Sequence, residues 1–369
     1  MTSVGVVETR FLDLPEPLPL DCGRSLPQVR VAYETYGTLA PSRDNVILVC
    51  HALSGDAHAA GISEKAASAR DDLEVAGLGW WDGMIGPGKA FDTDRFFVVS
   101  TNLLGGCAGT TGPSSLFQGE FYGPDFPVIT VADMVRCQRA FLDALGIERL
   151  AAVAGGSLGG MQALEWAVSY PDQVDAIVVI ASTHALQPQG VAWNAIARES
   201  ILRDPDWQGG RYYGTGRSPD AGMGVARMVG HITYLSAAGL EEKFGRRFQD
   251  GLHYTFTEPE FEVESYLRHQ AASFVRRFDA NTYLYLSRAL TYFDLDLASL
   301  GVVEARTLLI SFSSDWLYPP SGSHEIARAL SECGKPVENH VIDAPYGHDC
   351  FLLEEARQIP IVRRFLHEG

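Results

Sequence analysis

The sequence is poor in cysteine and places none of its cysteines in a close pair. Its 369 residues contain 6 cysteines, and no two of them form a C-x-x-C motif. Disulfide frameworks and zinc sites need cysteines at defined spacings, so this pattern predicts free thiols in a reducing compartment. The H-E-x-x-H and EF-hand motifs are absent from the sequence as well. We therefore expect no bound metal.

Long apolar runs and an excess of positive charge are also missing. No run approaches the roughly 18 apolar residues of a membrane-spanning helix, and the N-terminus lacks the basic and apolar segments of a signal peptide. The 29 Lys and Arg residues against 46 Asp and Glu residues give a formal net charge of −17. This charge argues against nucleic acid or an anionic membrane as a partner, although local basic residues can still bind an anionic ligand. We expect a soluble, cytoplasmic protein.

Short apolar runs alternate with helical stretches along much of the chain. Apolar residues make up 46 % of the sequence, which is enough for a large core. Alternating β and α units predict an α/β fold with a mostly parallel sheet covered by helices on both faces. The apolar runs lie at 46–50, 96–100, 150–154, 174–181, 307–312 and 337–342, and the helical stretches at 130–146 and 161–167.

The alternation is interrupted once. From about Thr183 to about Ser299 the pattern is mostly helical and rich in aromatic residues and arginine. We therefore predict an α/β domain formed by residues 1–183 and 300–369, with a helical insertion at 184–299. The polar and weakly patterned segment 64–76 is predicted to be a loop.

A glycine-rich turn at residues 155–160 carries the strongest functional signal. It reads Gly-Gly-Ser-Leu-Gly-Gly, follows the apolar run 150–154 and precedes the helical stretch 161–167. A strand, a tight turn with Gly-x-Ser-x-Gly and a helix form a nucleophile elbow, which raises the serine hydroxyl above the sheet. The amides and the positive dipole end of the helix point at the same spot. The pattern predicts acyl chemistry on Ser157.

A serine nucleophile needs a base and an acid that orients the base. After such an elbow the acid and then the histidine follow along the chain, each beyond the end of a strand. Asp315 follows the apolar run 307–312, and His348 follows the run 337–342. We predict a triad of Ser157, Asp315 and His348. Asp343 is the alternative acid, but it lies on the same strand and loop as His348.

Backbone amides are expected to stabilise the oxyanion of the tetrahedral intermediate. One predicted donor is the N–H of Leu158, directly after the nucleophile. The other is the N–H of Leu53, in the loop that follows the apolar run 46–50. The glycine-rich segment 105–112 lacks the Lys-Ser/Thr ending of a phosphate-binding loop, and we predict a loop near the rim of the site.

Three polar residues of the insertion fall on one face of a predicted helix. Arg227, His231 and Tyr234 are spaced by four and three residues. The face is either the polar stripe of an amphipathic helix or a binding site, because an arginine beside a catalytic pocket suits a substrate carboxylate.

Several segments spread along nearly the whole chain carry motifs that belong together: residues 51–55, 79–82, 102–107, 109–115, 155–166, 226–236, 277–283 and 346–349. In these segments the chain resembles the homoserine O-acyltransferases. The resemblance implies an α/β-hydrolase fold with a helical lid, no permanently bound cofactor, and a homodimer formed through the lid. It further implies a ping-pong transfer from acyl-CoA through Ser157 to the side-chain hydroxyl of L-homoserine, for methionine biosynthesis.

The resemblance also assigns the substrate contacts. Arg227 matches the family's contact to the substrate carboxylate, Asp349 matches its contact to the ammonium group, and Tyr234 is a further candidate for this pocket. The lid would restrict water, because an acyl-serine that water reaches freely is hydrolysed. For the coenzyme A moiety the sequence offers Lys243, Arg246 and Arg247 without selecting among them.

The acyl donor depends on one position after the triad acid. Succinyl-transferring members tend to carry arginine two residues after the Asp, where this chain has Leu317. We therefore expect acetyl-CoA as the donor, with succinyl-CoA as the alternative because segments 51–55 and 228–236 resemble the succinyl members. L-Serine is an alternative acceptor, since one methylene discriminates by only about 1–3 kcal/mol. A serine ester hydrolase and a catalytically inactive binding scaffold are the competing hypotheses.

Overall fold

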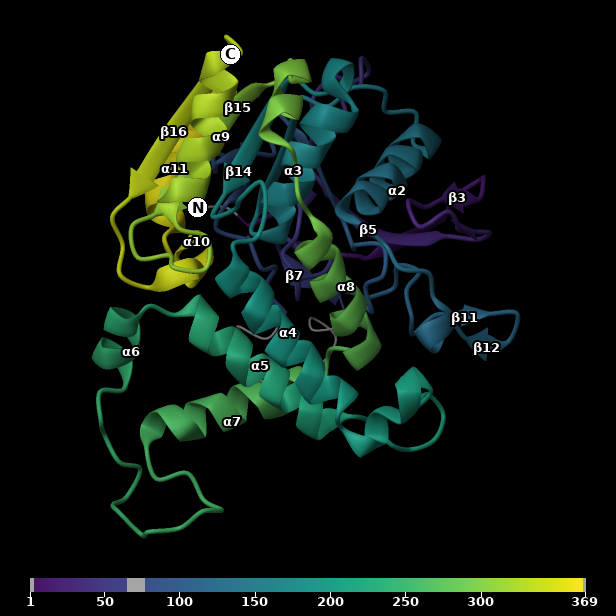
Figure 1. The fold of residues 1–369 in the computed structure, drawn as a ribbon. Helices are drawn as coiled ribbons and strands as arrows, with labels where there is room; N and C mark the ends of the chain where they lie inside the picture. Colours follow the sequence, from purple (N-terminus) through teal and green to yellow (C-terminus); the bar gives the residue numbers. More distant parts are fainter. Residues whose placement is uncertain (1–2, 65–76, 368–369) are drawn as a thin grey trace.

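An eight-stranded, mostly parallel sheet forms the centre of the protein (Figure 1). The computed structural model describes residues 3–64 and 77–367, so the predicted loop at 64–76 lies outside the described residues except for Glu64. The strand order is β16-β15-β14-β13-β6-β10-β5-β2. Strands β16 to β10 run parallel, and at one edge β5 is antiparallel to β10 and β2 is antiparallel to β5. The predicted α/β class is confirmed.

The elements have the following bounds. The sheet consists of β2 (Arg10–Asp13), β5 (Arg30–Tyr36), β6 (Val46–Cys50), β10 (Phe97–Thr101), β13 (Ala152–Gly156), β14 (Ala176–Ile180), β15 (Arg306–Phe312) and β16 (Val337–Ile342). Four small pairs are β1 (Val6–Val7) with β7 (Ile62–Ser63), β3 (Leu18–Pro19) with β4 (Ser25–Leu26), β8 (Ile85–Gly86) with β9 (Phe91–Asp92), and β11 (Leu116–Phe117) with β12 (Glu120–Phe121). The helices outside the lid are α2 (Val131–Ala144), α3 (Leu158–Ser169), α9 (Pro320–Glu332), α10 (Cys350–Leu353) and α11 (Glu355–His367).

The central strands are apolar along their whole length because both faces of the sheet are covered. All five residues of β6 are fully buried. Val46 and Leu48 belong to the core that α2, α3 and α9 cover, whereas Ile47 and Val49 belong to the core on the side of α11. The bounds of β6 and β16 agree with the predicted runs, and the remaining predicted strands are shifted by one or two residues.

Local signals set the ends of α2. Thr130 Oγ1 accepts a hydrogen bond from the Asp133 N–H at 3.1 Å, and Asp133 Oδ2 accepts one from the Thr130 N–H at 3.0 Å. This reciprocal capping satisfies two amides that the helix itself leaves free. The helix ends before Gly146, which has a positive φ of 68°. The predicted helix at 130–146 is confirmed.

Five α-helices between β14 and β15 form the lid: α4 (Pro188–Leu202), α5 (Asp220–Tyr234), α6 (Ala237–Lys243), α7 (Glu262–Phe274) and α8 (Ala280–Tyr292). Figure 1 shows α4, α5 and α7 stacked below the sheet, with α6 at the outer end and α8 rising toward the strands. The helical character predicted for this part of the chain agrees with the structure, while the exact domain boundaries stay a prediction. Among the described helices, none is long and apolar enough to span a membrane.

Candidate active site

Ser157 occupies the turn between β13 and α3 in a strained backbone conformation. Its φ of 57° and ψ of −123° lie in a region that side chains rarely adopt, at a cost of about 1–3 kcal/mol. Two hydrogen bonds hold the turn. The Ser157 N–H donates to the Ile180 carbonyl at 3.0 Å, and Ser182 Oγ donates to the Ser157 carbonyl at 2.8 Å. The hydroxyl therefore projects above the sheet at the start of a helix, as the sequence predicted.

Close backbone approaches explain the glycines around Ser157. A Cβ atom on Gly159 would lie 2.1 Å from the carbonyl oxygen of Cys50, and one on Gly155 would lie 2.4 Å from the backbone of Gly159. Backbone atoms cannot give way by a rotamer change, so no larger residue fits at either position without moving the elbow.

Asp315 and His348 are joined by a hydrogen bond at the ends of β15 and β16. His348 Nδ1 lies 2.8 Å from Asp315 Oδ2, and the pair is buried. Asp315 Oδ1 accepts hydrogen bonds from the N–H groups of Leu317 at 3.0 Å and Tyr318 at 2.9 Å. These amides hold the carboxylate in place, so that Nδ1–H of His348 points at it and Nε2 is left free to act as a base.

Asp343, the alternative acid, forms its hydrogen bonds with residues other than His348. Its Oδ1 accepts a hydrogen bond from Ser313 Oγ at 2.6 Å, and its carbonyl accepts one from Arg357. The geometry therefore favours Asp315 as the partner of His348. No direct hydrogen bond joins Ser157 Oγ to His348 within the described residues, and such contacts often tighten only when substrate binds.

Two cavities meet at Ser157. The larger one measures about 240 Å³ and brings together Ser157, His348, Arg227 and Asp349. The smaller one measures about 40 Å³ and contains Leu317. Leu53, Ser157 and Tyr234 line both cavities. All predicted catalytic and substrate-binding side chains thus lie around one site, although their catalytic roles stay predictions.

The two predicted oxyanion donors belong to segments that face Ser157. Leu158 is the first residue of α3, so its N–H has no acceptor within the helix. Leu53 lies in a turn in which the Gly55 N–H donates to the Ala52 carbonyl at 3.1 Å. Among the described residues neither amide has a hydrogen-bond acceptor, so both are available to an oxyanion.

His51 shapes this turn, a role that the sequence did not indicate. Its Nδ1 donates to the Ala52 carbonyl at 2.7 Å, and its Nε2 accepts the Leu103 N–H at 3.1 Å. Burial lowers the pKa of His51, so the ring stays neutral and keeps both bonds. From the lid, Arg277 donates to the Ser54 carbonyl at 3.0 Å and ties the same turn to the lid.

The larger cavity presents two charged side chains of opposite sign, Arg227 and Asp349, that form no ion pair with another described residue. Arg227 forms no ion pair with any described carboxylate, its Nε is buried without a partner, and its guanidinium lies 4.5 Å from the ring centre of Phe274. Burial raises the pKa of Asp349, while His348, Arg227 and Lys243 act in the opposite direction. A cation and an anion that are held apart in one cavity match the carboxylate and ammonium groups of an amino acid.

His231, the third residue of the predicted helix face, is also in this cavity. Its Nδ1 is hydrogen-bonded to the Tyr266 hydroxyl at 2.9 Å, and its buried Nε2 has no partner in the described part of the chain. Burial, together with the nearby cations Arg227 and Lys243, lowers the pKa of His231 to about 3. Its spacing from Arg227 was the one sequence signal for this position.

The loop at 105–112 packs against the antiparallel edge of the sheet instead of the site. Thr111 Oγ1 accepts the Arg30 N–H at 2.8 Å, and Thr110 Oγ1 donates to the Asn102 carbonyl at 2.8 Å. No residue of the loop lines either cavity beside Ser157. Its predicted place at the rim of the site is not supported by these contacts. Within residues 3–64 and 77–367, no cluster of three metal-ligating side chains occurs.

Known proteins resemble this chain over nearly all of its length. A family model described as alpha/beta hydrolase fold matches residues 45–355. A homoserine O-succinyltransferase of Alkalilimnicola ehrlichii is 53% identical over 361 residues, covering 95% of this chain and 92% of that protein. A homoserine O-acetyltransferase of Methanohalobium evestigatum is 50% identical over 372 residues, covering 99% of this chain and 74% of that protein. The chain belongs to the homoserine O-acyltransferases of the α/β-hydrolase fold.

A solved structure extends this assignment to three dimensions. The homoserine O-acetyltransferase from Bacillus anthracis superimposes with a TM-score of 0.90 at 31% identity, and the match covers 98% of both chains. The sequence-based family assignment and the enzyme class, acyltransferase, are confirmed. Relatives named for succinyl and for acetyl transfer are similarly close, so sequence identity does not distinguish the two donors.

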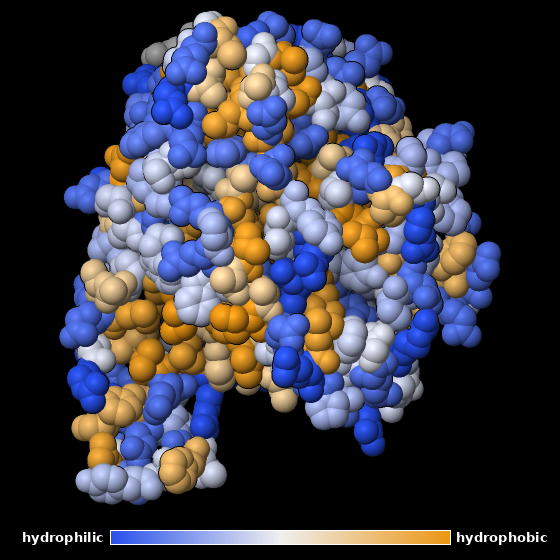
Figure 2. Space-filling model, viewed as in Figure 1, coloured by the Kyte–Doolittle hydropathy of each residue, from blue (hydrophilic) through white to orange (hydrophobic). Residues whose placement is uncertain are grey.

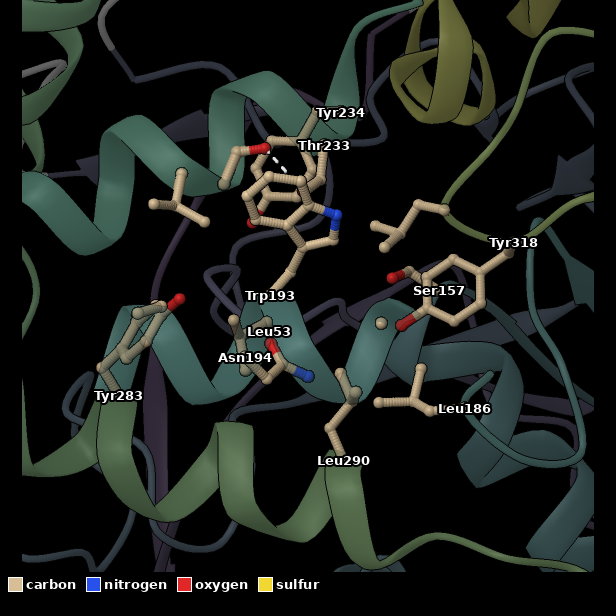
Figure 3. Close-up of a pocket in the computed structure, with 15 residues that line it drawn as sticks. Leu53, Ser157, Leu186, Trp193, Asn194, Thr233, Tyr234, Tyr283, Leu290 and Tyr318 are labelled. Atoms are coloured by element: carbon tan, nitrogen blue, oxygen red, sulfur yellow. Dashed lines mark hydrogen bonds between the residues drawn. The ribbon is translucent and has the colours of Figure 1, made fainter. Parts of the chain in front are cut away.

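In this homoserine O-acyltransferase the smaller cavity is uncharged (Figure 3). Leu317, Leu186 and Leu290 supply apolar walls, and Trp193 reaches in from α4. No lysine, arginine or histidine is among its lining residues. Tyr318 lies beside Ser157; burial raises the pKa of its phenol, and the Ser157 hydroxyl acts in the opposite direction.

The three lid cations that the sequence offered for coenzyme A differ in their surroundings. Arg247 is paired with Glu262 at 2.8 Å, and Arg246 lies over the ring of Phe261 at 5.2 Å. Lys243 Nζ lies 4.4 Å from the ring centre of Tyr266, and its charge acts on groups of the larger cavity. Of the three, Lys243 is therefore the cation whose charge acts on the functional site.

Proposed function

We propose that the protein transfers an acetyl group from acetyl-CoA to the side-chain hydroxyl of L-homoserine, through an acyl-Ser157 intermediate. The observation that carries this proposal is the pairing of two different cavities at Ser157. A small uncharged cavity suits a short acyl group, and a larger cavity with Arg227 and Asp349 suits an amino acid. The product, O-acetyl-L-homoserine, is an activated ester for methionine biosynthesis.

The first half-reaction loads the serine. His348 Nε2 takes the proton of Ser157 Oγ as this oxygen attacks the carbonyl carbon of acetyl-CoA. The oxyanion that forms accepts hydrogen bonds from the N–H groups of Leu53 and Leu158. When the C–S bond breaks, His348 gives its proton to the sulfur, and free coenzyme A leaves. Asp315 stabilises the imidazolium throughout, because its carboxylate lies 2.8 Å from Nδ1.

In the second half-reaction the homoserine hydroxyl is the nucleophile and Ser157 Oγ is the leaving group. The homoserine hydroxyl gives its proton to His348 and attacks the acyl carbon of the ester. The bond to Ser157 Oγ then breaks, and the serine regains its proton from His348. Arg227 and Asp349 bind the carboxylate and the ammonium group, with Tyr234 beside them, and so fix the position of the hydroxyl.

The uncharged small cavity favours acetyl-CoA over succinyl-CoA. A succinyl group would place a carboxylate among residues that include no cation, and an unpaired buried charge is unfavourable. The substitution Leu317→Arg supplies that cation. We expect it to lower the rate with acetyl-CoA and raise the rate with succinyl-CoA; a variant with unchanged donor preference would contradict the role of Leu317.

The lid supports the proposed contacts to coenzyme A and to a second protomer. Lys243 would contact the anionic part of the donor, because it is the one of the three candidates whose charge acts on His231 and Asp349 of the larger cavity. Figure 2 shows apolar side chains gathered over the α5 and α6 part of the lid. Tyr254 and Phe256, in the segment after α6, are almost fully exposed. We propose that these surfaces meet in a homodimer, which sedimentation analysis would detect.

Thiol release is the direct test of the reaction. Acetyl-CoA and succinyl-CoA are each supplied with L-homoserine, with L-serine or with no acceptor. Homoserine-dependent release from acetyl-CoA supports the proposal, and release mainly from succinyl-CoA would assign the other donor. Equal release without an acceptor would indicate a hydrolase. Ser157→Ala is the control; a tenth of the normal turnover in this variant would exclude Ser157 as the nucleophile.

A further inference from the structure

The larger cavity contains a third polar group whose partner is missing. His231 is only 6% exposed, and its Nε2 is buried without a hydrogen-bond partner among the residues that the structure describes. Arg227 lies one helical turn earlier on α5, and within the same residues its buried Nε has no partner either. Both side chains line the cavity beside Ser157. Buried polar groups in folded proteins are nearly always paired, so two unpaired groups on one face indicate an absent ligand.

The hydrogen bond to Tyr266 determines which nitrogen of His231 carries the proton. The hydroxyl of Tyr266 lies 2.9 Å from Nδ1. A phenol is a better donor than a neutral imidazole N–H, and an imidazole nitrogen is a better acceptor than a phenol oxygen. The Tyr266 hydroxyl therefore donates to Nδ1, and the single proton of the neutral ring resides on Nε2. The ring is neutral because burial and two neighbouring cations, Arg227 and Lys243, disfavour its charged form.

The unpaired atom of His231 is thus an N–H donor beside an arginine. Two adjacent donors fit a group with two acceptor oxygens and negative charge, which is a carboxylate. Asp349, in the same cavity, is the acceptor for a cationic group. We propose that the Nε2–H of His231 binds the carboxylate of the amino-acid acceptor together with Arg227, and that Tyr266 is a positioning residue that fixes this tautomer. This inference rests on the proposed function, because it requires an amino acid as the acceptor.

A pair of ligands that differ only in the carboxylate tests the contact. L-Homoserine has one, and 3-amino-1-propanol is the same molecule without it. Binding is measured by calorimetry in Ser157→Ala protein, so that no turnover is needed. Adding His231→Phe should weaken homoserine binding about tenfold or more while changing 3-amino-1-propanol binding little, since a hydrogen bond to a charged group is lost only with homoserine.

Further variants separate a contact from a structural role. His231→Gln places an amide N–H near the position of Nε2 and should restore part of the homoserine affinity. Tyr266→Phe leaves the tautomer free, so we expect a smaller loss that is again confined to homoserine. His269→Phe, an exposed histidine of α7, is the matched control and should change neither affinity.

The outcomes distinguish this inference from the proposed reaction. Equal losses for both ligands in His231→Phe, or no loss for either, would overturn the contact. Failure of the Ser157→Ala protein to bind homoserine at all would overturn it as well. If homoserine binds and His231→Phe weakens homoserine binding selectively, the contact is supported. Thiol release that does not depend on homoserine in the wild type would refute the transfer reaction but not this contact.

Discussion

Replacing Arg227 with methionine tests how the larger cavity holds its substrate. Methionine keeps an unbranched side chain of moderate length but removes the guanidinium, which lies over the ring of Phe274 at 4.5 Å and has no carboxylate partner among the described residues. The free protein therefore loses no ion pair. The loss falls on the complex, where the substrate carboxylate would be left in a cavity without its cation.

The magnitude follows from the burial of this group. Removing one member of a buried charge pair costs about 2–5 kcal/mol. Arg227 is half-buried and lines a cavity that opens to solvent, so the lower part of this range applies. About 2–3.5 kcal/mol corresponds to a loss of roughly 30- to 300-fold in kcat/KM for homoserine. Arg227→Lys should lower kcat/KM for homoserine less, because lysine retains the charge although it cannot form the bidentate hydrogen bonds of arginine.

Steady-state kinetics and a burst measurement together provide the assay. kcat/KM for homoserine should fall as stated, whereas the burst of thiol that reports acyl-Ser157 formation should keep its rate and amplitude. Arg276→Met, an exposed arginine after α7, is the matched control and should change neither quantity. An unchanged KM for homoserine in Arg227→Met, or a burst that fails as strongly as turnover, would refute the reasoning and leave Arg227 as part of a polar helix face.

Three further predictions concern the elbow and two half-buried carboxyl groups. Gly159→Ala places a Cβ 2.1 Å from the Cys50 carbonyl and should lower the free energy of unfolding by at least about 2 kcal/mol; a Tm close to that of the wild type would contradict this. Burial raises the pKa of Asp349 above its ordinary 3.8, so folding favours the neutral form and ionisation destabilises the protein as the pH rises through that raised pKa. Asp349→Asn should therefore raise Tm at pH 7 but not below pH 3.8, while homoserine binding weakens. Burial likewise raises the pKa of Glu355 from 4.5 to about 7, so its stabilising effect is complete below pH 4.5 and is lost as the pH rises through 7. In chemical denaturation at pH 8, the free energy of unfolding of Glu355→Gln should exceed that of the wild type by about 1–2 kcal/mol, a value reduced because Glu355 is partly exposed. At pH 4 the two free energies of unfolding should be equal.

Features that depend on neighbouring residues could be predicted from the sequence. The elbow around Ser157 follows from small residues at fixed spacing, because the crowding that requires them arises within one turn. Thr130 and Asp133 mark the start of α2 in the same local way. Asp315 and His348 were found because the carboxyl ends of parallel strands meet at one edge of a sheet.

Features that depend on distant segments were missed or left open. The edge strands β5 and β2 carry mixed polar and apolar residues. β5 takes its place in the sheet by pairing with β10, and β2 takes its place by pairing with β5. His51 has no sequence signal for its role, because its ring bridges its own turn and Leu103. Arg277 reaches the Ser54 carbonyl across 223 positions of the sequence.

The sequence by itself determined the family, the parallel core of the sheet and the three residues of the predicted triad. Each of these follows from a local pattern, in which residues close together in the sequence form one turn, strand or helix. Only the tertiary structure decided what surrounds them. It placed Tyr266 against His231, left Arg227 without a carboxylate partner among the described residues, and divided the space at Ser157 into an uncharged and a charged cavity. The physical reason is that the burial and pairing of a side chain depend on which distant segments pack around it, and the lid brings five helices to the end of the sheet.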